Sequence, residues 1–182
     1  GESVGRLKKE GEIRSIGASN VTPGDLEAYI DTGALDAIQE EYSMVKRNIE
    51  TTLLPLCRKN AVSVLSYSSL ALGLLSGKVG PDRVFAEDDQ RRGNPRFSQS
   101  NRQKIARLMG ALEPVAAGHG ASVAQVVIAW TIAQPGITFS LCGARDPAQA
   151  VENAAAARLR LTDSEVALIS AGVAEHLVGL DS

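Results

Sequence analysis

The sequence contains few of the residues that usually bind metals or form disulfides. It has two cysteines, two histidines and two methionines among its 182 residues. Cys57 and Cys142 lie within apolar segments and lack metal-ligand spacing, so we expect buried, reduced thiols in a cytoplasmic protein. The acidic run at 87–89 is interpreted as part of a solvated loop. The sequence therefore predicts no metal site.

Strong net charge and long apolar runs are also absent. The formal net charge is −2, which provides no field to attract nucleic acid or an anionic membrane surface. No apolar run approaches the roughly 18 residues that a membrane span requires. With 44% hydrophobic residues, the chain can still build one sizeable core. We therefore expect neither a nucleic-acid nor a membrane partner.

The beginning of the chain carries no initiator methionine, because residue 1 is glycine. Residues 3–11, SVGRLKKEG, have the composition of the last turns of a helix, with basic residues near its end and Gly11 after it. No apolar signal-peptide segment is present to account for this start. We expect the chain to begin inside a structural element.

Short β-rich runs alternate with helical segments along the rest of the chain. The residue patterns predict strands at 13–19, 36–42, 61–69 and 137–143, and helices at 22–33, 48–60, 101–120, 122–136, 146–157 and 161–177. Pro55 argues against an unbroken helix over 48–60. Residues 76–99 are rich in Gly, Pro, Asp and Arg, and we interpret them as a long, lid-like loop.

This alternation predicts an α/β fold with parallel strands joined by right-handed crossovers. Four strands fit either a small doubly wound sheet or part of a (β/α)8 barrel. Both architectures bind ligands at the carboxyl ends of their strands. Each expected strand here ends in polar residues or glycine: Ser19 and Asn20; Gln39, Glu40 and Glu41; Tyr67, Ser68 and Ser69; Gly143 and Arg145. Four such ends in succession indicate a ligand site.

The segment GARDPAQAVEN, residues 143–153, has a purely structural interpretation. Asp146 would cap the helix that begins at Pro147, and Gln149 would complete a capping box. Under this interpretation, Glu152 and Asn153 are ordinary solvated helix positions.

The same segment also has a functional interpretation, which is compatible with the first. Gly143 would let the backbone approach a ligand, while Arg145 and the helix N-terminus would attract a phosphate. Gln149, Glu152 and Asn153 share one helix face, where they could hydrogen-bond to a purine edge.

Residues 68–78, SSLALGLLSGK, are similarly open to two interpretations. They could form a strand end running into a hydrophobic turn with an exposed lysine. Alternatively, Gly73 and Gly77 permit close backbone approach, and Ser76 with Lys78 could bind a diphosphate. A single Gly-rich turn of this kind is a weak signal by itself.

Together, GEIRSIGASN, IQEEYSMVKR, LSYSSLALGLLSGK and CGARDPAQAVENAAA closely resemble, in this order, the second half of aldo-keto reductases. Those proteins are NADPH-dependent carbonyl reductases with a (β/α)8, or TIM, barrel. The resemblance is strongest to bacterial members related to the inositol-utilisation reductase, and more distant to potassium-channel β subunits. It covers essentially the whole chain and implies that residues 1–182 form strands 5 to 8 with their helices.

The resemblance implies an NADP(H) site whose residues fall into four groups. The nicotinamide carboxamide would be held by Ser19, Asn20 and the amide of Gln39, with Tyr67 stacked on the ring. The diphosphate loop would comprise Ser68, Leu70, Gly73, Ser76 and Lys78, and Arg91 would match the lid arginine. The 2′-phosphate and adenine clamp would comprise Gly143, Arg145, Gln149, Glu152 and Asn153. Arg145 would favour NADPH over NADH. Ser69 and Cys142 replace common prolines, which leaves the strand-end geometry open.

The family's catalytic tyrosine, lysine, aspartate and histidine come from the first four strands, which this chain does not contain. We expect His119, His176 and Tyr42 to be structural or exposed, and we predict no catalytic residue here. The parent protein would reduce an aldehyde or ketone by hydride transfer, while this chain alone would be inactive. A non-catalytic nucleotide-binding or assembly module, or an inactive truncated fragment, are the alternatives. Its open sheet edges predict pairing with the missing N-terminal half or with a second copy.

Overall fold

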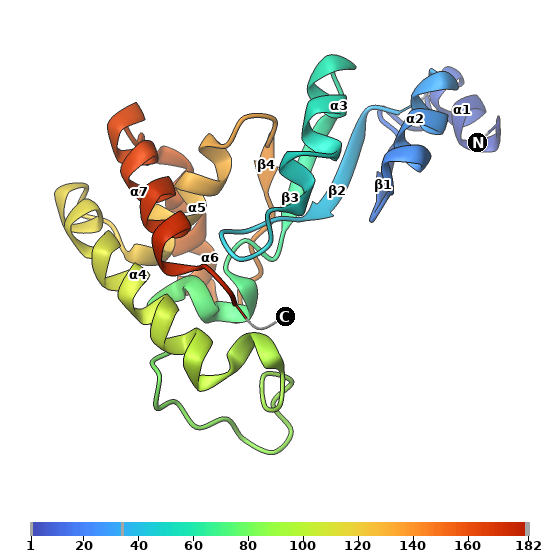
Figure 1. Ribbon diagram of the computed structural model, residues 1–182. Helices are drawn as coiled ribbons and strands as arrows, with labels where there is room; N and C mark the ends of the chain where they lie inside the picture. The colour runs from blue at the N-terminus through green and yellow to red at the C-terminus, as the bar shows by residue number, and fades with distance from the viewer. Residues whose placement is uncertain (1, 34, 181–182) are drawn as a thin grey trace.

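The computed structural model describes residues 2–33 and 35–180, and Figure 1 shows their arrangement. Its centre is a four-stranded parallel sheet made of β1 (Gly17–Ser19), β2 (Ala37–Glu41), β3 (Ser63–Tyr67) and β4 (Phe139–Ser140). The spatial order of the strands, β1-β2-β3-β4, follows their order in the chain. A doubly wound sheet reverses its strand order at a switch point. The order within the described strands is therefore that of a barrel wall.

Helices separate the strands as the sequence predicts. They are α1 (Glu2–Lys9), α2 (Pro23–Asp31), α3 (Leu53–Lys59), α4 (Gln99–Gly118), α5 (Val123–Ala133), α6 (Pro147–Ala155) and α7 (Asp163–His176). Short 3-10 turns occupy η1 (Asn48–Glu50), η2 (Ala71–Ser76), η3 (Pro95–Phe97) and η4 (Ala156–Arg158). At the starts of α2 and α7, Thr22 and Thr162 each accept a hydrogen bond from the third helical amide, completing capping boxes. Local chemistry therefore sets these helix starts.

Three predicted elements differ from the structure. The helix expected over 48–60 divides into η1 and α3, so that Pro55 falls in the first turn of α3, where an amide has no helical partner. The strands expected at 13–19 and 137–143 are much shorter, although single hydrogen bonds extend the ladder beyond them. For example, the amide of Leu141 donates to the carbonyl of Ser66 at 2.7 Å. Edge strands lose pairing because each has a neighbour on one side only.

One face of the sheet packs against helices to form the core. Ile38 and Glu40 of β2 are buried, whereas the residues between them are only half-buried, and β3 shows the same period of two. The largest fully buried side chain is Trp130 of α5. Its ring stacks on Tyr42 at 6.4 Å, and its Nε1–H donates to Ser170 of α7 at 3.0 Å.

No single helix in the described part of the chain is long and apolar enough to cross a membrane. α4 and α5 pass that test only as a pair, and a bend of 90° separates them. Both are core helices: Ile105 and Leu108 of α4 and Val126 and Val127 of α5 have no exposed surface. Figure 1 shows them packed with α7 beside β4.

Candidate functional site

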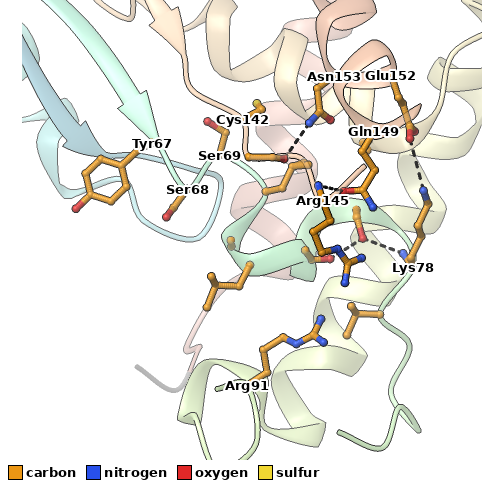
Figure 2. A pocket seen from close by; sticks show the side chains of 18 of the residues that line it. Tyr67, Ser68, Ser69, Lys78, Arg91, Cys142, Arg145, Gln149, Glu152 and Asn153 are labelled. Carbon is orange, nitrogen blue, oxygen red and sulfur yellow. Dashed lines mark hydrogen bonds and ion pairs between the residues drawn. The ribbon is translucent and has the colours of Figure 1, made fainter. Parts of the chain in front are cut away.

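A cavity of about 1010 Å³ lies beyond the carboxyl ends of β3 and β4, between the lid (residues 76–99) and α6. Figure 2 shows several of its side chains. Most of the residues predicted to bind a cofactor line it: Tyr67, Ser68, Leu70, Gly73, Ser76, Lys78, Arg91, Gly143, Arg145, Gln149, Glu152 and Asn153. Ser19, Asn20 and Gln39 are not among the lining residues. Residues from the segments 67–78 and 143–153 therefore meet at one cavity, and their binding of a cofactor stays a prediction.

The turn after β3 has an unusual backbone. Ser68, Ala71 and Leu72 have φ values of 58°, 48° and 56°, and Gly73 follows at 86°. Non-glycine residues in this left-handed region are strained, and such strain concentrates at ligand-binding segments. The hydroxyl of Ser76 donates to the carbonyl of Gly73 at 2.6 Å, which closes the turn. A strained backbone, closed by this hydrogen bond, therefore lies against the cavity.

Glu152 of α6 is held by three contacts around the cavity. Its Oε1 accepts a 2.7 Å hydrogen bond from the hydroxyl of Ser122, and its carbonyl accepts one of 2.9 Å from Nε2 of Gln125. Its Oε2 lies 3.6 Å from Nζ of Lys78, at the root of the lid. The expectation that Glu152 is simply a solvated helix position is therefore wrong, because α5 and the lid both contact it.

The start of α6 is capped slightly differently from the prediction. Asp146 accepts a 2.8 Å hydrogen bond from the amide of Gln149, as expected. Gln149 does not complete a capping box, because its Oε1 accepts from the amide of Arg145 at 3.1 Å, one residue before the cap. Asn153 is not merely solvated either, since its Nδ2 donates to the carbonyl of Gly143 at 3.1 Å. These bonds fold residues 143–146 back onto α6.

The guanidinium of Arg145 remains available for a ligand. Its side chain is exposed, and within residues 2–33 and 35–180 no carboxylate forms an ion pair with it. In Figure 2 it extends from the strand end toward Arg91. A Cβ atom at Gly143 would meet open space, so the neighbouring backbone is accessible from the cavity. This corner can bind an anion.

Arg91 lines the opposite side of the cavity but already has partners. Its Nε and Nη2 bind the carboxylate of Asp89 at 2.8 and 2.5 Å, and its Cζ lies 4.7 Å from the centre of the Phe85 ring. The hydrogen bonds from Arg91 lower the pKa of Asp89 to about 2. Arg83 also lines the cavity, although no sequence motif marks it as a site residue. Only its position in the folded lid identifies it, since the lid has no periodic pattern.

The remaining predicted residues lie at the end of β1 and within β2, and they connect to the cavity through Tyr67. The carbonyl of Gln39 accepts from the Ser19 hydroxyl at 3.0 Å and from the Asn20 amide at 3.1 Å. The backbone of Asn20 has a left-handed conformation, with φ at 56°. Its Oδ1 accepts a 2.7 Å hydrogen bond from the Tyr67 hydroxyl. These contacts fix the carboxyl ends of three successive strands relative to one another.

Glu40 of β2 stabilises this arrangement through a bond to the backbone that follows β1. The sequence indicated it only as a polar residue at a strand end. Its side chain is 6% exposed, and its Oε1 accepts a 2.7 Å hydrogen bond from the amide of Val21. Burial raises the pKa of Glu40 despite that bond. A carboxylate at a buried strand position cannot be predicted from alternation, which favours an apolar residue there.

The two cysteines have different surroundings. Cys57 is fully buried, and burial raises its pKa to about 11. Cys142 is only half-buried and lines the cavity, which corrects the expectation that both thiols are buried. Burial also raises the pKa of the Cys142 thiol, so it is a weak nucleophile. Its neighbour Ser140 shares a 2.7 Å hydrogen bond with Ser69, and this bond holds the ends of β3 and β4 together.

The side chains considered as catalytic candidates have structural contacts. Tyr42 is fully buried, and its hydroxyl donates to Glu50, which also binds Arg47. Burial raises the pKa of Tyr42, so it is a poor proton donor. His119 at the end of α4 lies 2.8 Å from Glu165 of α7. Among the described residues, no group of three or more His, Cys, Asp or Glu side chains could hold a metal ion.

Comparisons with known proteins agree with this geometry. The chain is similar to the glycerol dehydrogenase AKR11B4 from Gluconobacter oxydans, with a TM-score of 0.87 and 32% identity over 96% of this chain and 53% of that one. It is 35% identical to the NADH-specific methylglyoxal reductase of Escherichia coli, over 91% of this chain and 50% of that protein. It is 32% identical to aldo-keto reductase YhdN of Bacillus subtilis, over 81% of this chain and 45% of that protein. The chain thus spans about half the length of the curated relatives it matches.

A sequence model described as the Aldo/keto reductase family matches residues 3–173. The match includes all four strands and both segments that line the cavity. The chain therefore belongs to the aldo/keto reductase family.

Proposed function

We propose that the cavity binds NADP(H) in an extended conformation along the ends of the four strands. The observation that carries this proposal is the guanidinium of Arg145, which forms no ion pair with a carboxylate of the described residues. It lies beside the accessible backbone of Gly143 and the N-terminus of α6. A volume of about 1010 Å³ is at the upper end of the range for small-molecule sites. The residues present fit a long anionic ligand.

Each part of the cofactor has a matching group of residues under this proposal. Arg145 would bind the 2′-phosphate, while Gln149, Glu152 and Asn153 would contact the adenine. The strained turn with Ser68, Leu70, Gly73 and Ser76, together with Lys78 and Arg91, would hold the diphosphate. Tyr67 would stack on the nicotinamide, and Ser19, Asn20 and Gln39 would bind its carboxamide. When bound, the cofactor would supply the hydride, and these residues would orient it and exclude water from one of its faces.

The form of the cofactor follows from Arg145. One relative is named as NADH-specific, and another, from Schizosaccharomyces pombe and 29% identical, is named with NADP(+). Both forms therefore occur among relatives. A guanidinium with no carboxylate partner is poorly suited to the neutral ribose of NADH, because a dianionic phosphate would satisfy its charge far better. We propose NADP(H) on this basis.

For the whole protein, we propose the reduction of aldehydes or ketones, with this chain forming strands 5 to 8 of the barrel. A tyrosine outside this chain would protonate the carbonyl oxygen, and the chain alone would be inactive. A nucleotide-binding module without catalysis is the second candidate, and the burial of Tyr42 beneath Glu50 favours it for the isolated chain. The free thiols of Cys57 and Cys142 support a cytoplasmic location.

The inner face of the sheet supports a proposal about partners. Phe139 of β4 is 58% exposed and pairs in register with Leu65 of β3. Apolar side chains on an open sheet favour a covering layer. We propose that the N-terminal half of a barrel, or failing that a second copy, covers this face.

The direct test is to titrate the purified chain with NADPH and NADH, following the cofactor's fluorescence, and to assay carbonyl reduction in the same sample. Saturable NADPH binding without turnover would support the cofactor site and the absence of a catalytic acid. Turnover by the chain alone would contradict the second point. A folded chain that binds neither nucleotide would contradict the first. A monomeric mass at micromolar concentration would count against self-pairing.

A further inference from the structure

Arg102, in the first turn of α4, is bonded to three distant points of the lid. Its Nε donates to the carbonyl of Phe97 at 3.0 Å, and its Nη1 donates to the carbonyls of Gly80 and Arg83 at 3.1 and 2.8 Å. The side chain is half-buried and is not among the residues that line the cavity. One guanidinium, outside the cavity lining, thus joins Gly80 and Arg83 near the start of the lid to Phe97 near its end.

The same guanidinium takes part in a small cluster around Phe85. The Cζ of Arg102 lies 5.6 Å from the centre of the Phe85 ring, and the Cζ of Arg91 lies 4.7 Å from it. The ring of Phe97, which is 4% exposed, meets Phe85 edge-on at 5.6 Å. The lid has few apolar residues, so these cation–π and aromatic contacts replace an ordinary hydrophobic core.

The lid residues that Arg102 binds lie next to, or are themselves, residues that line the cavity. Val79 lines the cavity next to Gly80, and Arg83 lines it while its carbonyl is bound by Arg102. Arg91 lines it while contacting Phe85. An opening that moves residues 80–85 away from α4 must therefore break several Arg102 contacts together.

We propose that Arg102 is a positioning residue that keeps the lid closed over the cavity and thereby sets the rate at which the nucleotide dissociates. The proposal rests on the proposed function, because it needs a nucleotide beneath the lid. Its physical basis is the planar fork of arginine, which reaches several carbonyls at once in a way that a lysine ammonium cannot. In many enzymes that close a lid over their ligand, lid opening rather than chemistry limits turnover.

The experiment compares Arg102→Gln with Arg107→Gln, which removes an exposed arginine from the same helix. Limited trypsin digestion would be followed at the lid sites Arg83 and Arg91, and NADPH dissociation would be measured by rapid displacement. Release of 2′,5′-ADP, which has no diphosphate or nicotinamide beneath the lid, would be the ligand control. For Arg102→Gln we expect lid cleavage and NADPH release roughly tenfold faster, from the loss of hydrogen bonds to a charged group. We expect unchanged 2′,5′-ADP release, and no effect of Arg107→Gln.

Cleavage and NADPH release at wild-type rates in Arg102→Gln would overturn the proposal, as would equal acceleration of NADPH and 2′,5′-ADP release. If Arg102→Gln fails to fold, Phe85→Leu removes the ring but leaves α4 intact, and it should accelerate both processes to a smaller degree. Wild-type rates in Phe85→Leu would then overturn the proposal. If the wild-type chain binds no NADPH, the proposed function fails separately. Trypsin cleavage of the lid then decides the role of Arg102 by itself.

Discussion

The ammonium of Lys78 lies 3.6 Å from Oε2 of Glu152, which joins the root of the lid to α6 beside the cavity. Because the Lys78 side chain is 71% exposed, this ion pair adds little to folding stability. Its effect is geometric: Glu152 is also bound by Ser122, so the lid root, α5 and α6 meet at one carboxylate. The proposed cofactor clamp is therefore built by tertiary contacts that its local sequence does not reveal.

Ser122 has two roles that one substitution would remove. It is the N-cap of α5, and its hydroxyl also donates to Glu152. We expect Ser122→Ala to lower the free energy of unfolding by about 1–2 kcal/mol, from the lost cap and the lost hydrogen bond. Urea unfolding would measure this change. Ser100→Ala, at an exposed position in the first turn of α4, is the matched control and should be nearly neutral. Equal losses for both variants would contradict this role for Ser122.

A substitution at the buried Tyr42 can test whether this tyrosine stabilises the fold rather than binding a ligand. Tyr42→Phe keeps the ring stacked on Trp130 but removes the hydroxyl that donates to Glu50. We expect a loss of about 1–2 kcal/mol in the free energy of unfolding, because a buried hydrogen bond to a charged group is lost. Nucleotide binding should be unchanged, as Tyr42 does not line the cavity. A variant of normal stability with impaired binding would point instead to a direct role in the site.

The raised pKa of Glu40 predicts that the stability of the fold depends on pH. Burial raises its pKa in the folded chain above its ordinary value of 4.5, so folding disfavours the ionised form. The unfolding free energy of the wild type should fall as pH rises through the folded-state pKa. Glu40→Gln should therefore be more stable than the wild type at pH 7, and this advantage should vanish below pH 4.5. Thermal unfolding at both pH values measures the difference. A variant less stable at neutral pH would show that the carboxylate's hydrogen bonds outweigh its burial.

The lowered pKa of Asp89 predicts a pH dependence of stability with the opposite sign. Its hydrogen bonds to Arg91 lower its pKa from 3.8 to about 2 in the folded chain. The stabilisation from this pair is thus complete above pH 3.8 and is lost as pH falls toward 2. Carbon-13 NMR of the Asp89 carboxyl group would record the titration. In Arg91→Gln, the midpoint should return toward 3.8. A midpoint that stays low without Arg91 would rule out the ion pair as its cause.

The sequence alone predicted the parts of the fold and site that depend on local chemistry. Asp146 caps α6 as expected, and the helix expected at 22–33 begins at Pro23. The segments 68–78 and 143–153 both reach one cavity, as the carboxyl ends of parallel strands in a barrel do. Cap preferences and turn glycines act within a few residues, so they can be read from the chain directly.

The parts that depend on distant partners were not predictable. Gln149 binds the Arg145 amide rather than that of Asp146, because the 143–146 turn folds back onto α6. Glu40 occupies a buried strand position, since the amide of Val21 reaches it across the β1–α2 turn. Arg102 is an ordinary helical arginine in the sequence, and only the folded lid gives it three carbonyl partners. Such roles arise from tertiary structure.

The most direct test of the central claim is the binding of NADPH and NADH to the wild type, to Arg145→Ala and to Arg158→Ala, which removes an exposed arginine after α6. If Arg145 binds the 2′-phosphate, its loss should weaken NADPH binding by roughly 10- to 100-fold, the amount expected for a hydrogen-bonded charge pair. NADH binding should hardly change, and Arg158→Ala should behave as the wild type. Equal weakening of both nucleotides, or none in Arg145→Ala, would contradict an NADP(H) site at this end of the cavity.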